Sequence, residues 1–319
     1  MNYNLTTNIK RIIPQPILDQ LRWLKAIPAR RVLARAPEMP AWLGWKELEL
    51  LAQKYPFPPV YNYDPESLEQ RGKERAGEIL GLLRHPADGT NTFLELGCWD
   101  GMTSCALQRA GKSATAVDLR PWGFDPRAKR AGVAFLQMDA TRLQFDDGRF
   151  DFVFSYNAFE HFDEPEQVLQ EAIRVVRPGG YLYLNFGPLY NSPMGLHAYR
   201  SIAIPYLQFL FPPELLANYV EAQELKPIDF DLVNGWSLEN FNQLWDRYAH
   251  QLQRTKYNEK LDVSHLDLIV KYPSCFKSKT QHFDSLIVSN IKVLFQRIQE
   301  LLPNNNGRNR TQINTDERR

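Results

Sequence analysis

The segment 92–107, TFLELGCWDGMTSCAL, contains the pattern that decides the fold. Its first five residues are largely apolar, which predicts a strand buried on both faces of a sheet. Gly97 and Gly101 then bracket a tight turn, and the residues after Gly101 have the spacing of a helix. Such a strand-to-helix turn is a common ligand site, because the backbone N–H groups at a helix start have no partner within the helix. We therefore expect a small ligand at this turn.

The turn departs from the glycine fingerprint of dinucleotide-binding proteins. That fingerprint, G-x-G-x-x-G, lets a pyrophosphate approach the start of a helix. Here Gly97 is followed by Trp99 and Met102 at the other two glycine positions, so the phosphate cradle is missing. Glu95 and Asp100 add two carboxylates, which would repel a pyrophosphate but attract a ligand with ammonium and sulfonium groups. The turn favours a cationic nucleoside.

The rest of the chain predicts an α/β fold. Short apolar strands alternate with helical stretches, as is typical of a parallel sheet with crossover helices. We predict a Rossmann-like, doubly wound, mostly parallel seven-stranded sheet with a helical N-terminal arm and an acceptor-side lid insertion. The predicted strands are 92–96, 113–119, 133–138, 151–156, 179–186, 252–259 and 290–298, and the main predicted helices are 66–84, the stretch after residue 101, 164–177 and 238–249.

These patterns divide the chain into five parts. We predict an N-terminal arm and connector over 1–65, a ligand-binding core over 66–187, a lid insertion over 188–237, a C-terminal completion of the sheet over 238–300 and a disordered tail over 301–319. Residues 1–36 contain seven basic side chains against the single acid Asp19, with apolar residues interspersed. Such an arm either covers its own domain or lies on an anionic membrane or a partner, and we favour the first.

Polar side chains follow five successive strands, where each strand ends. Glu95 lies near the end of the first predicted strand, Asp118 ends the second and Asp139 ends the third. Asn157, Glu160 and His161 follow the fourth strand, and residues 185–187 end the fifth. Because the carboxyl ends of parallel strands meet at one edge of the sheet, we expect these groups to form one site.

These motifs carry a resemblance to a known family. In their order and spacing, ELGCWDG, Asp118, QMDAT, FDFVFSYNAFEHF and VVRPGGYLYLNF resemble the class I S-adenosylmethionine-dependent methyltransferases over about residues 90–187. The resemblance implies S-adenosylmethionine as the cofactor, with Asp118 on the ribose hydroxyls and Asp139 on the adenine amino group. The other positions it implies are Glu95, Gly97 and Gly101 around the methionine part, Leu119, Met138 and Ala140 on the purine faces, and Asn157 beside the methyl group. Trp99 departs from the glycine that is most common at its position, and we expect its ring to cover the pocket instead.

The acceptor side offers three candidates for catalysis. Methyl transfer is an in-line displacement, so the enzyme must align the acceptor and help to deprotonate it. His161, in FEHF, and His197, in MGLHAY, have side chains suited to a base near neutral pH, and Glu160 is a partner or a helix cap. Residues 187–212 follow the fifth strand with tyrosines, His197 and several prolines, so we expect an acceptor wall with an aromatic lid.

Composition limits the partners. The 38 Lys and Arg against 37 Asp and Glu give a net charge of +1, which provides no general attraction for nucleic acid, so we expect a small-molecule acceptor. Three cysteines without metal-ligand spacing indicate neither a metal site nor a disulfide framework. The longest apolar run, 202–211, is about half as long as a membrane span. We expect a cytoplasmic protein, with peripheral membrane contact through the arm left open and the oligomeric state undetermined.

We predict methyl transfer to oxygen or nitrogen of a small molecule, such as a saccharide or a specialised metabolite. Two alternatives stay open at this point. One is a nicotinamide-dependent oxidoreductase on a related fold, which the missing glycines disfavour. The other is a non-catalytic module that binds the cofactor or a membrane surface through the basic arm.

Overall fold

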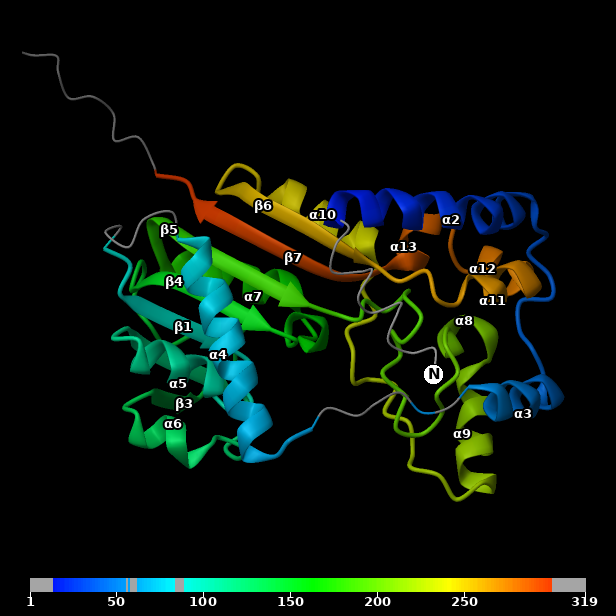
Figure 1. Ribbon diagram of the computed structural model, residues 1–319, viewed down its shortest axis with the longest axis horizontal. Coiled ribbons are helices and arrows are strands. Elements are labelled where there is room, and N and C mark those ends of the chain that lie inside the picture. Colours follow the sequence, from blue (N-terminus) through cyan, green and yellow to red (C-terminus); the bar gives the residue numbers. More distant parts are fainter. Residues whose placement is uncertain (1–13, 56, 58–61, 84–88, 300–319) are drawn as a thin grey trace, which may run out of the picture.

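The computed structural model describes residues 14–55, 57, 62–83 and 89–299. Within these residues the chain forms one seven-stranded sheet (Figure 1). Its strands are β1 (Thr92–Leu96), β2 (Ser113–Asp118), β3 (Ala134–Gln137), β4 (Phe150–Tyr156), β5 (Val176–Phe186), β6 (Leu252–Leu261) and β7 (Val288–Arg297). Each strand overlaps one of the seven that the sequence predicts.

The strand order is β3-β2-β1-β4-β5-β7-β6. Strands β1 to β5 pair in parallel, while β7 is antiparallel to both β5 and β6. The order reverses between β1 and β4, which is the switch point at which doubly wound sheets bind their ligands. The predicted α/β class and the mostly parallel sheet are confirmed, and the glycine turn after β1 lies at that switch point.

Helices cover both faces of the sheet, because alternate residues of its strands point to opposite sides. Phe93 belongs to one buried cluster with Ile79 and Leu107, whereas its neighbour Leu94 belongs to another with Val168. The helices of this part are α4 (Pro65–Leu82) and α5 (Met102–Arg109) on the first face, α7 (Pro165–Val175) and α10 (Leu238–Arg247) on the second, and the short α6 (Pro126–Arg130) between β2 and β3.

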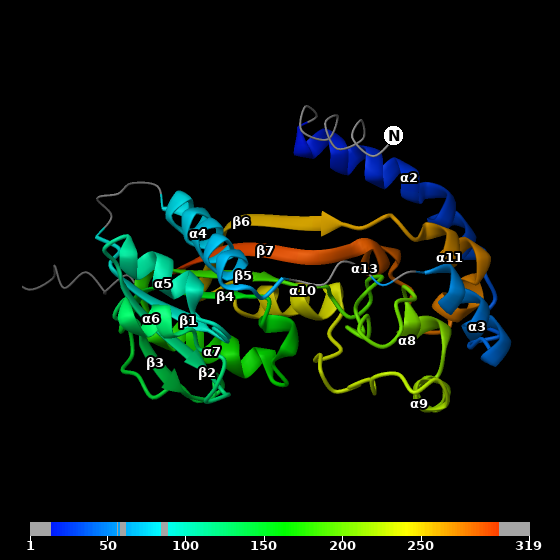
Figure 2. The ribbon, with the colours of Figure 1, turned by 60° about the horizontal axis from the view of Figure 1, so that its bottom comes forward.

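The remaining helices form a second half, which we name the helical lobe. It consists of α2 (Gln15–Arg35), α3 (Trp45–Lys54), α8 (Leu207–Leu210), α9 (Pro213–Ala222), α11 (Leu266–Lys271) and α12 (Pro273–Lys277), with α13 (Phe283–Ile287) leading into β7. Figures 1 and 2 both show this lobe beyond the carboxyl ends of β4 and β5. The lobe therefore faces the edge of the sheet at which a ligand is expected.

Proline residues mark the starts of several helices, two of which belong to the lobe. Proline occupies the first turn of α9 and α12, as it does in α4, α6 and α7. Proline is well tolerated there, because the N–H that it lacks would have no partner within the helix. The helix expected over 164–177 ends earlier than expected, at Val175, because Pro178 disfavours helical backbone at the residue before it.

The stretch 187–212, from which an aromatic lid was expected, belongs to the core in its second half. Residues 201–211 are all buried, and the Tyr206 hydroxyl donates to the Leu286 carbonyl at 2.8 Å. The rings of Tyr206 and Phe209 pack on Phe276, with centroids 5.0 and 5.3 Å apart. Moving these rings would expose much apolar surface, so this run is a fixed wall. The predicted disordered tail, 301–319, lies outside the described residues.

Candidate active site

The glycine turn after β1 has left-handed backbone at three positions. Gly97, Trp99 and Gly101 have φ angles of 67°, 48° and 71°. Trp99 thus adopts the conformation that the more usual glycine would adopt, although a large side chain makes it less favourable. Its N–H donates to Asp118 Oδ2 at 2.9 Å, which ties this strained residue to the end of β2. The Trp99 side chain is half exposed, which leaves part of its surface accessible to a ligand.

Two carboxyls of the turn bind the first turn of α5. The buried Glu95 accepts from Ser104 N at 3.2 Å and from Ser104 Oγ at 2.6 Å, and Asp100 accepts from Met102 N at 2.8 Å. Burial raises the pKa of Glu95 to about 7 and also raises the pKa of Asp100. A cation beside these groups would favour their charged forms. The pair is therefore suited to a positively charged ligand, as the sequence suggested.

Asp118 is the most heavily bonded carboxylate of the site. Besides Trp99 N–H, it accepts from Arg120 N at 3.0 Å, from Arg120 Nε at 3.0 Å and from Arg120 Nη2 at 2.9 Å. The Arg120 guanidinium also stacks on the Trp99 ring, 3.7 Å from its centroid. The guanidinium presents two donors to the two carboxylate oxygens, which is also what a ribose diol would present. Sequence reasoning missed Arg120, although its place two residues after Asp118 was a signal.

The residues expected around adenine lie where β2 and β3 end side by side. Asp118 and Gln137 are paired in register, and Met138 N donates to the Asp118 carbonyl at 3.0 Å. Leu119 and Asp139 are exposed, Met138 is half-buried and Ala140 is buried. Asp139 accepts from Thr141 N at 2.8 Å. Leu119, Met138 and Asp139 therefore remain accessible to a flat ligand, whereas Ala140 contributes mainly to the core.

The turn after β4 lies against the glycine turn. A Cβ atom placed on Gly97 would come within 2.5 Å of Ala158 Cβ and 3.4 Å of the Phe162 ring. Asn157, whose φ is 48°, donates from its backbone N to the Asn185 carbonyl at 2.8 Å. The two turns that the resemblance assigns to the cofactor and to the transferred methyl group are therefore in direct contact.

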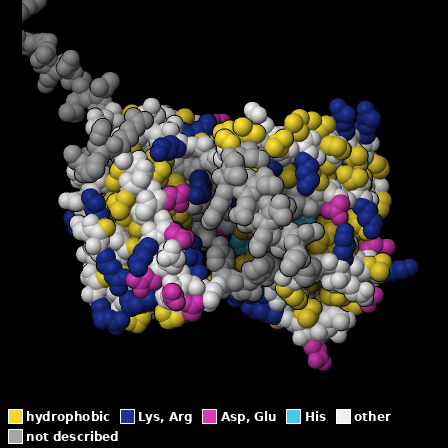
Figure 3. Space-filling model, in the orientation of Figure 1, with side chains coloured by type: hydrophobic (Ala, Val, Ile, Leu, Met, Phe, Trp, Pro, Cys, Tyr) yellow, Lys and Arg dark blue, Asp and Glu magenta, His cyan; other side chains and the backbone are white. Residues whose placement is uncertain are grey.

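The three catalytic candidates of the sequence come together beside these turns. Glu160 and His161 belong to the 3₁₀ turn η1 (Phe159–His161), and His197 comes from the insertion after β5. The rings of His161 and His197 meet edge to face with centroids 5.0 Å apart, and His161 Nε2 lies 4.0 Å from Glu160 Oε1. Tyr199 is close to His197, with ring centroids 6.2 Å apart. Figure 3 shows histidine side chains near the middle of one face, between the sheet and the helical lobe.

Hydrogen bonds fix which nitrogen of each imidazole carries the proton. His161 Nδ1 lies 2.7 Å from the Leu232 carbonyl, and His197 Nε2 lies 3.1 Å from the Pro188 carbonyl. Since a carbonyl only accepts, both of these nitrogens donate, and the other nitrogen of each ring keeps its lone pair. Burial lowers the pKa of His161 and lowers that of His197 to about 4. Both imidazoles are therefore neutral at pH 7 and able to accept a proton.

A segment far along the chain holds the catalytic turn in place. Asn234 N donates to the Glu160 carbonyl at 3.0 Å, and its side-chain amide donates to the carbonyls of Phe159 and Phe162 at 3.0 and 3.2 Å. Together with the bond from His161 to Leu232, these contacts fasten η1 to residues 232–234. Sequence reasoning missed Asn234, because a lone asparagine in a loop gives no signal of a partner some 75 residues away.

Glu160 is buried without a full set of hydrogen bonds. Its Oε1 accepts from Gly187 N at 3.1 Å, while Oε2 has no partner among the described residues. Burial raises the pKa of this carboxyl to about 8, so it is largely protonated at neutral pH in the absence of a cation. A positive charge on the neighbouring His161 imidazole, whose Nε2 lies 4.0 Å from Glu160 Oε1, would favour the ionised form of this carboxyl, and the ionised carboxyl would stabilise that charge.

The raised pKa of Glu160 makes stability depend on pH. Because the folded protein holds this proton more tightly than the unfolded chain, whose carboxyl has its ordinary pKa of 4.5, the stabilisation is complete below pH 4.5. It is lost as the pH rises toward 8. We expect Glu160→Gln, which mimics the protonated acid, to match the wild type at pH 5 and to exceed it at pH 8 by about 3 kcal/mol in free energy of unfolding.

Urea unfolding at both pH values measures this difference. Glu221→Gln, which removes an exposed carboxylate on α9, is the matched control and should show no gain at pH 8. An equal pH dependence in the wild type and in Glu160→Gln would contradict the buried, protonated state. The pKa of Glu95 is also raised, but Glu95 is present in both proteins, so its effect on the pH dependence of the unfolding free energy cancels in the comparison.

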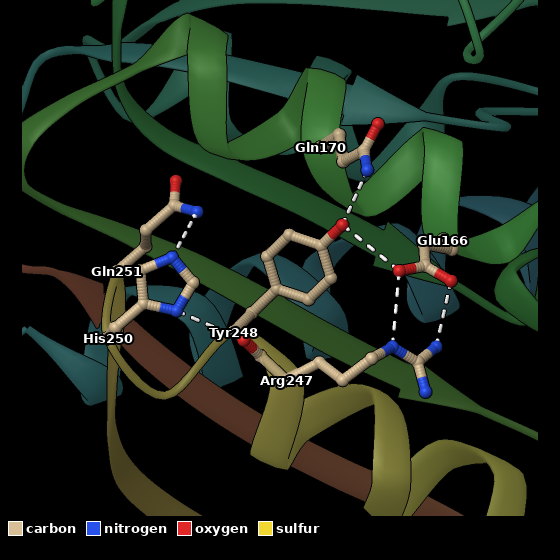
Figure 4. Close-up of a pocket in the computed structure, with 6 residues that line it drawn as sticks. All are labelled: Glu166, Gln170, Arg247, Tyr248, His250 and Gln251. Atoms are coloured by element: carbon tan, nitrogen blue, oxygen red, sulfur yellow. Dashed lines mark hydrogen bonds and ion pairs between the residues drawn. The ribbon is translucent and has the colours of Figure 1, made fainter.

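An open hollow of about 500 Å³ lies away from these turns, between α7, the end of α10 and the start of β6 (Figure 4). Its polar groups bind one another: Arg247 forms an ion pair with Glu166, and the Tyr248 hydroxyl bonds to Glu166 and Gln170. His250 Nδ1 donates to the Arg247 carbonyl, and His250 Nε2 accepts from the Gln251 side-chain amide. Because these groups already satisfy one another, the hollow is a weaker candidate than the site at the switch point.

Comparison with known proteins identifies the kind of domain that contains β1 to β5. Residues 94–184 match the protein family described as "Methyltransferase domain". Among curated relatives, a fatty-acid O-methyltransferase of Mycolicibacterium smegmatis is 32% identical over 50% of this chain and 56% of its own length. A 27-O-demethylrifamycin SV methyltransferase of Amycolatopsis mediterranei is 31% identical over 43% of this chain and 53% of its own length. The chain thus spans about half the length of these relatives.

The solved structures that resemble the chain include a SAM-dependent methyltransferase of Methanosarcina mazei. It is 18% identical, with a TM-score of 0.45, over 70% of this chain and 98% of that one. The fold, the switch-point site and the family match define the class: this chain carries a class I S-adenosylmethionine-dependent methyltransferase domain. S-adenosylmethionine is the cofactor of that domain, and the predicted family is confirmed.

Proposed function

We propose that the protein is an enzyme that transfers a methyl group from S-adenosylmethionine to an oxygen of a small molecule. The observation that carries this proposal is the contact between Gly97 and Ala158. It joins the turn that would hold the methionine part of the cofactor to the turn that carries Glu160 and His161. A neutral base beside the transferred methyl group is what an oxygen acceptor with a proton to lose requires.

The residues of the first turn fit the cofactor by charge and by hydrogen bonding. S-adenosylmethionine supplies an electrophilic methyl group on a positively charged sulfur. Asp118 would accept from the two ribose hydroxyls, as it now accepts from Arg120. Glu95 and Asp100 would favour the cationic part. The methionine part would be bordered by Gly97, Gly101 and Trp99. The adenine would be bordered by Leu119, Met138, Asp139 and Ala140, and the methyl group by Asn157.

His161 is the proposed proton acceptor, with Glu160 as its support and His197 as the ring that positions it. Glu160 Oε1 lies 4.0 Å from His161 Nε2, and an imidazolium formed there would favour the ionised form of Glu160, which would stabilise it in turn. Among the described residues, His197 forms no ion pair with a carboxylate, and its ring packs edge-on against His161. Removal of the acceptor proton by His161 would leave the acceptor oxygen ready to attack the methyl carbon, and the carbon–sulfur bond would break as the new bond forms.

An oxygen acceptor is favoured over nitrogen by the relatives. The fatty-acid O-methyltransferase and a ubiquinone biosynthesis O-methyltransferase of Coxiella burnetii are named for oxygen methylation. Saccharides and specialised metabolites remain within the proposed range. The oxidoreductase alternative is not retained, because the matched family is that of methyltransferases and the pyrophosphate cradle is missing. A small-molecule acceptor, rather than a nucleic acid, and a cytoplasmic location also remain predictions.

Two measurements test the proposal. Calorimetry with the full chain should show binding of S-adenosylmethionine, and the release of S-adenosylhomocysteine should be detectable with lipophilic or glycosylated alcohols and acids. Failure to bind the cofactor would remove the proposal as a whole. Binding with turnover only on amines would keep the methyltransferase but overturn the oxygen acceptor.

Arg120 should compete with the cofactor for Asp118. Because the carboxylate oxygens are already bonded, the ribose can bind only after the guanidinium moves away. We expect Arg120→Met to tighten S-adenosylmethionine binding about fivefold, since a partly exposed ion pair contributes about 1 kcal/mol. Calorimetry checks the dissociation constant, with Arg149→Met at the opposite edge of the sheet as the control. Weaker binding by Arg120→Met would mean that Arg120 holds the cofactor instead.

A further inference from the structure

Helix α2 has two apolar faces, of which only one is covered. Ala26, Ala29 and Leu33 are buried on the side of α2 that contacts the other helices of the lobe, α11 and α12. Ile17, Leu21 and Leu24, which we name the apolar stripe, are 47%, 50% and 60% exposed. With 3.6 residues per turn, the stripe lies on the side of the helix opposite to the buried face. Figure 2 shows α2 at the outer margin of the molecule.

Unpaired positive charge surrounds the apolar stripe. Lys25, Arg31 and Arg35, which we name the basic group, are exposed on the same side of α2. Among the residues that the structure describes, none of the three forms an ion pair, whereas Arg22 and Arg30 are paired with Asp19 and Asp284. Figure 3 shows hydrophobic side chains with Lys and Arg beside them at the upper right, where Figure 1 draws α2.

We propose that this face of α2 binds the surface of an anionic lipid bilayer. The apolar stripe would enter the boundary between headgroups and acyl chains, and the basic group would contact lipid phosphates, as in helices that lie in a membrane interface. In the described part of the chain, no helix combines the length and the apolar composition needed to cross a bilayer.

The same face suits a bilayer better than a second copy of the chain. Three half-exposed side chains provide far less apolar area than the roughly 800 Å² per partner that stable protein interfaces bury. Two copies joined through this face would also bring their basic groups close together, and the like charges would repel. A lipid surface needs neither a large area nor a complementary shape.

Flotation of the full chain with vesicles tests the proposal. We expect binding to vesicles of phosphatidylcholine with phosphatidylserine, little binding to phosphatidylcholine alone, and weaker binding as salt rises. The double variant Leu21→Glu, Leu24→Glu should partition onto the anionic vesicles at least tenfold more weakly than the wild type. Replacing the three residues of the basic group by glutamine should lower partitioning onto the vesicles about 100-fold, since each positive charge raises membrane affinity about fivefold. Leu50→Glu, at a similarly exposed leucine on α3, is the matched control and should bind like the wild type.

Three outcomes would overturn the proposal. They are no binding of the wild type to anionic vesicles, binding by the double variant as strong as by the wild type, and a dimer in light scattering that the double variant abolishes. Circular dichroism melting of each variant checks that it is folded, which the exposure of the replaced side chains leads us to expect. S-adenosylmethionine binding should be unchanged in all variants, so this test is separate from that of the proposed function.

Discussion

Replacing Asp118 by alanine is expected to weaken S-adenosylmethionine binding about 100-fold. The carboxylate would accept from two ribose hydroxyls, and hydrogen bonds to a charged group contribute about 1.5 to 3 kcal/mol each, part of which the loss of the Arg120 pair offsets. A net loss of about 3 kcal/mol corresponds to this change in the dissociation constant. Calorimetry measures it directly. Turnover at saturating cofactor should change far less, because Asp118 does not contact the reacting atoms.

Asp147→Ala is the control for this variant. Asp147 is an exposed carboxylate on the loop before β4, at the opposite edge of the sheet, and its pair with Arg174 is a surface ion pair. Its removal should leave the dissociation constant unchanged. Wild-type affinity in a folded Asp118→Ala protein would mean that the ribose binds elsewhere, and the assignment of the whole turn would have to be abandoned.

The second large effect is expected at the imidazole pair. His161→Ala should lower turnover roughly 100-fold to 10,000-fold, the usual contribution of a positioned base, while the affinity for S-adenosylmethionine stays within about twofold. His197→Ala should lower turnover less, because its role is to position the His161 ring. The release of S-adenosylhomocysteine, measured with an acceptor on which the wild type is active, provides the rates.

The pH dependence of turnover separates a base from a structural imidazole. Since burial lowers the pKa of His161, turnover should be flat above pH 7 and should fall as the pH drops through that pKa. His161→Ala should lose this dependence. His250→Ala, which removes an exposed imidazole bonded to the Arg247 carbonyl, is the matched control. If His197→Ala were the more damaging variant, the base would be His197 instead.

Local patterns were sufficient to predict the sheet and the cofactor turn. Apolar runs of strand length, and glycines placed for a left-handed turn, depend on neighbouring residues only, so strands such as β1 and β4 could be located from the sequence. Helices of the lobe were harder to predict. Their prolines lie at helix starts, where they are favourable, but in a sequence they look like breaks in the chain.

The lid and the partners of charged groups could not be predicted in the same way. Tyr206 and Phe209 became part of the core because they contact α12 and α13, which lie some 70 to 80 residues further along the chain. The pairing of Asp118 with Arg120 depends on how the chain bends after β2, which periodicity does not describe.

By itself, the sequence determined which residues could carry chemistry: the carboxylates at the strand ends, the glycine turn with Trp99 in place of a glycine, and two histidines, a residue type that ordinarily titrates near neutral pH. Only the tertiary structure decided that the rings of His161 and His197 meet, and that Ala158, in the turn that leads to His161, lies against Gly97. The physical reason is that strand and turn formation follow from local backbone preferences. Contact between side chains 36 or more residues apart instead depends on how the sheet and the helical lobe pack together.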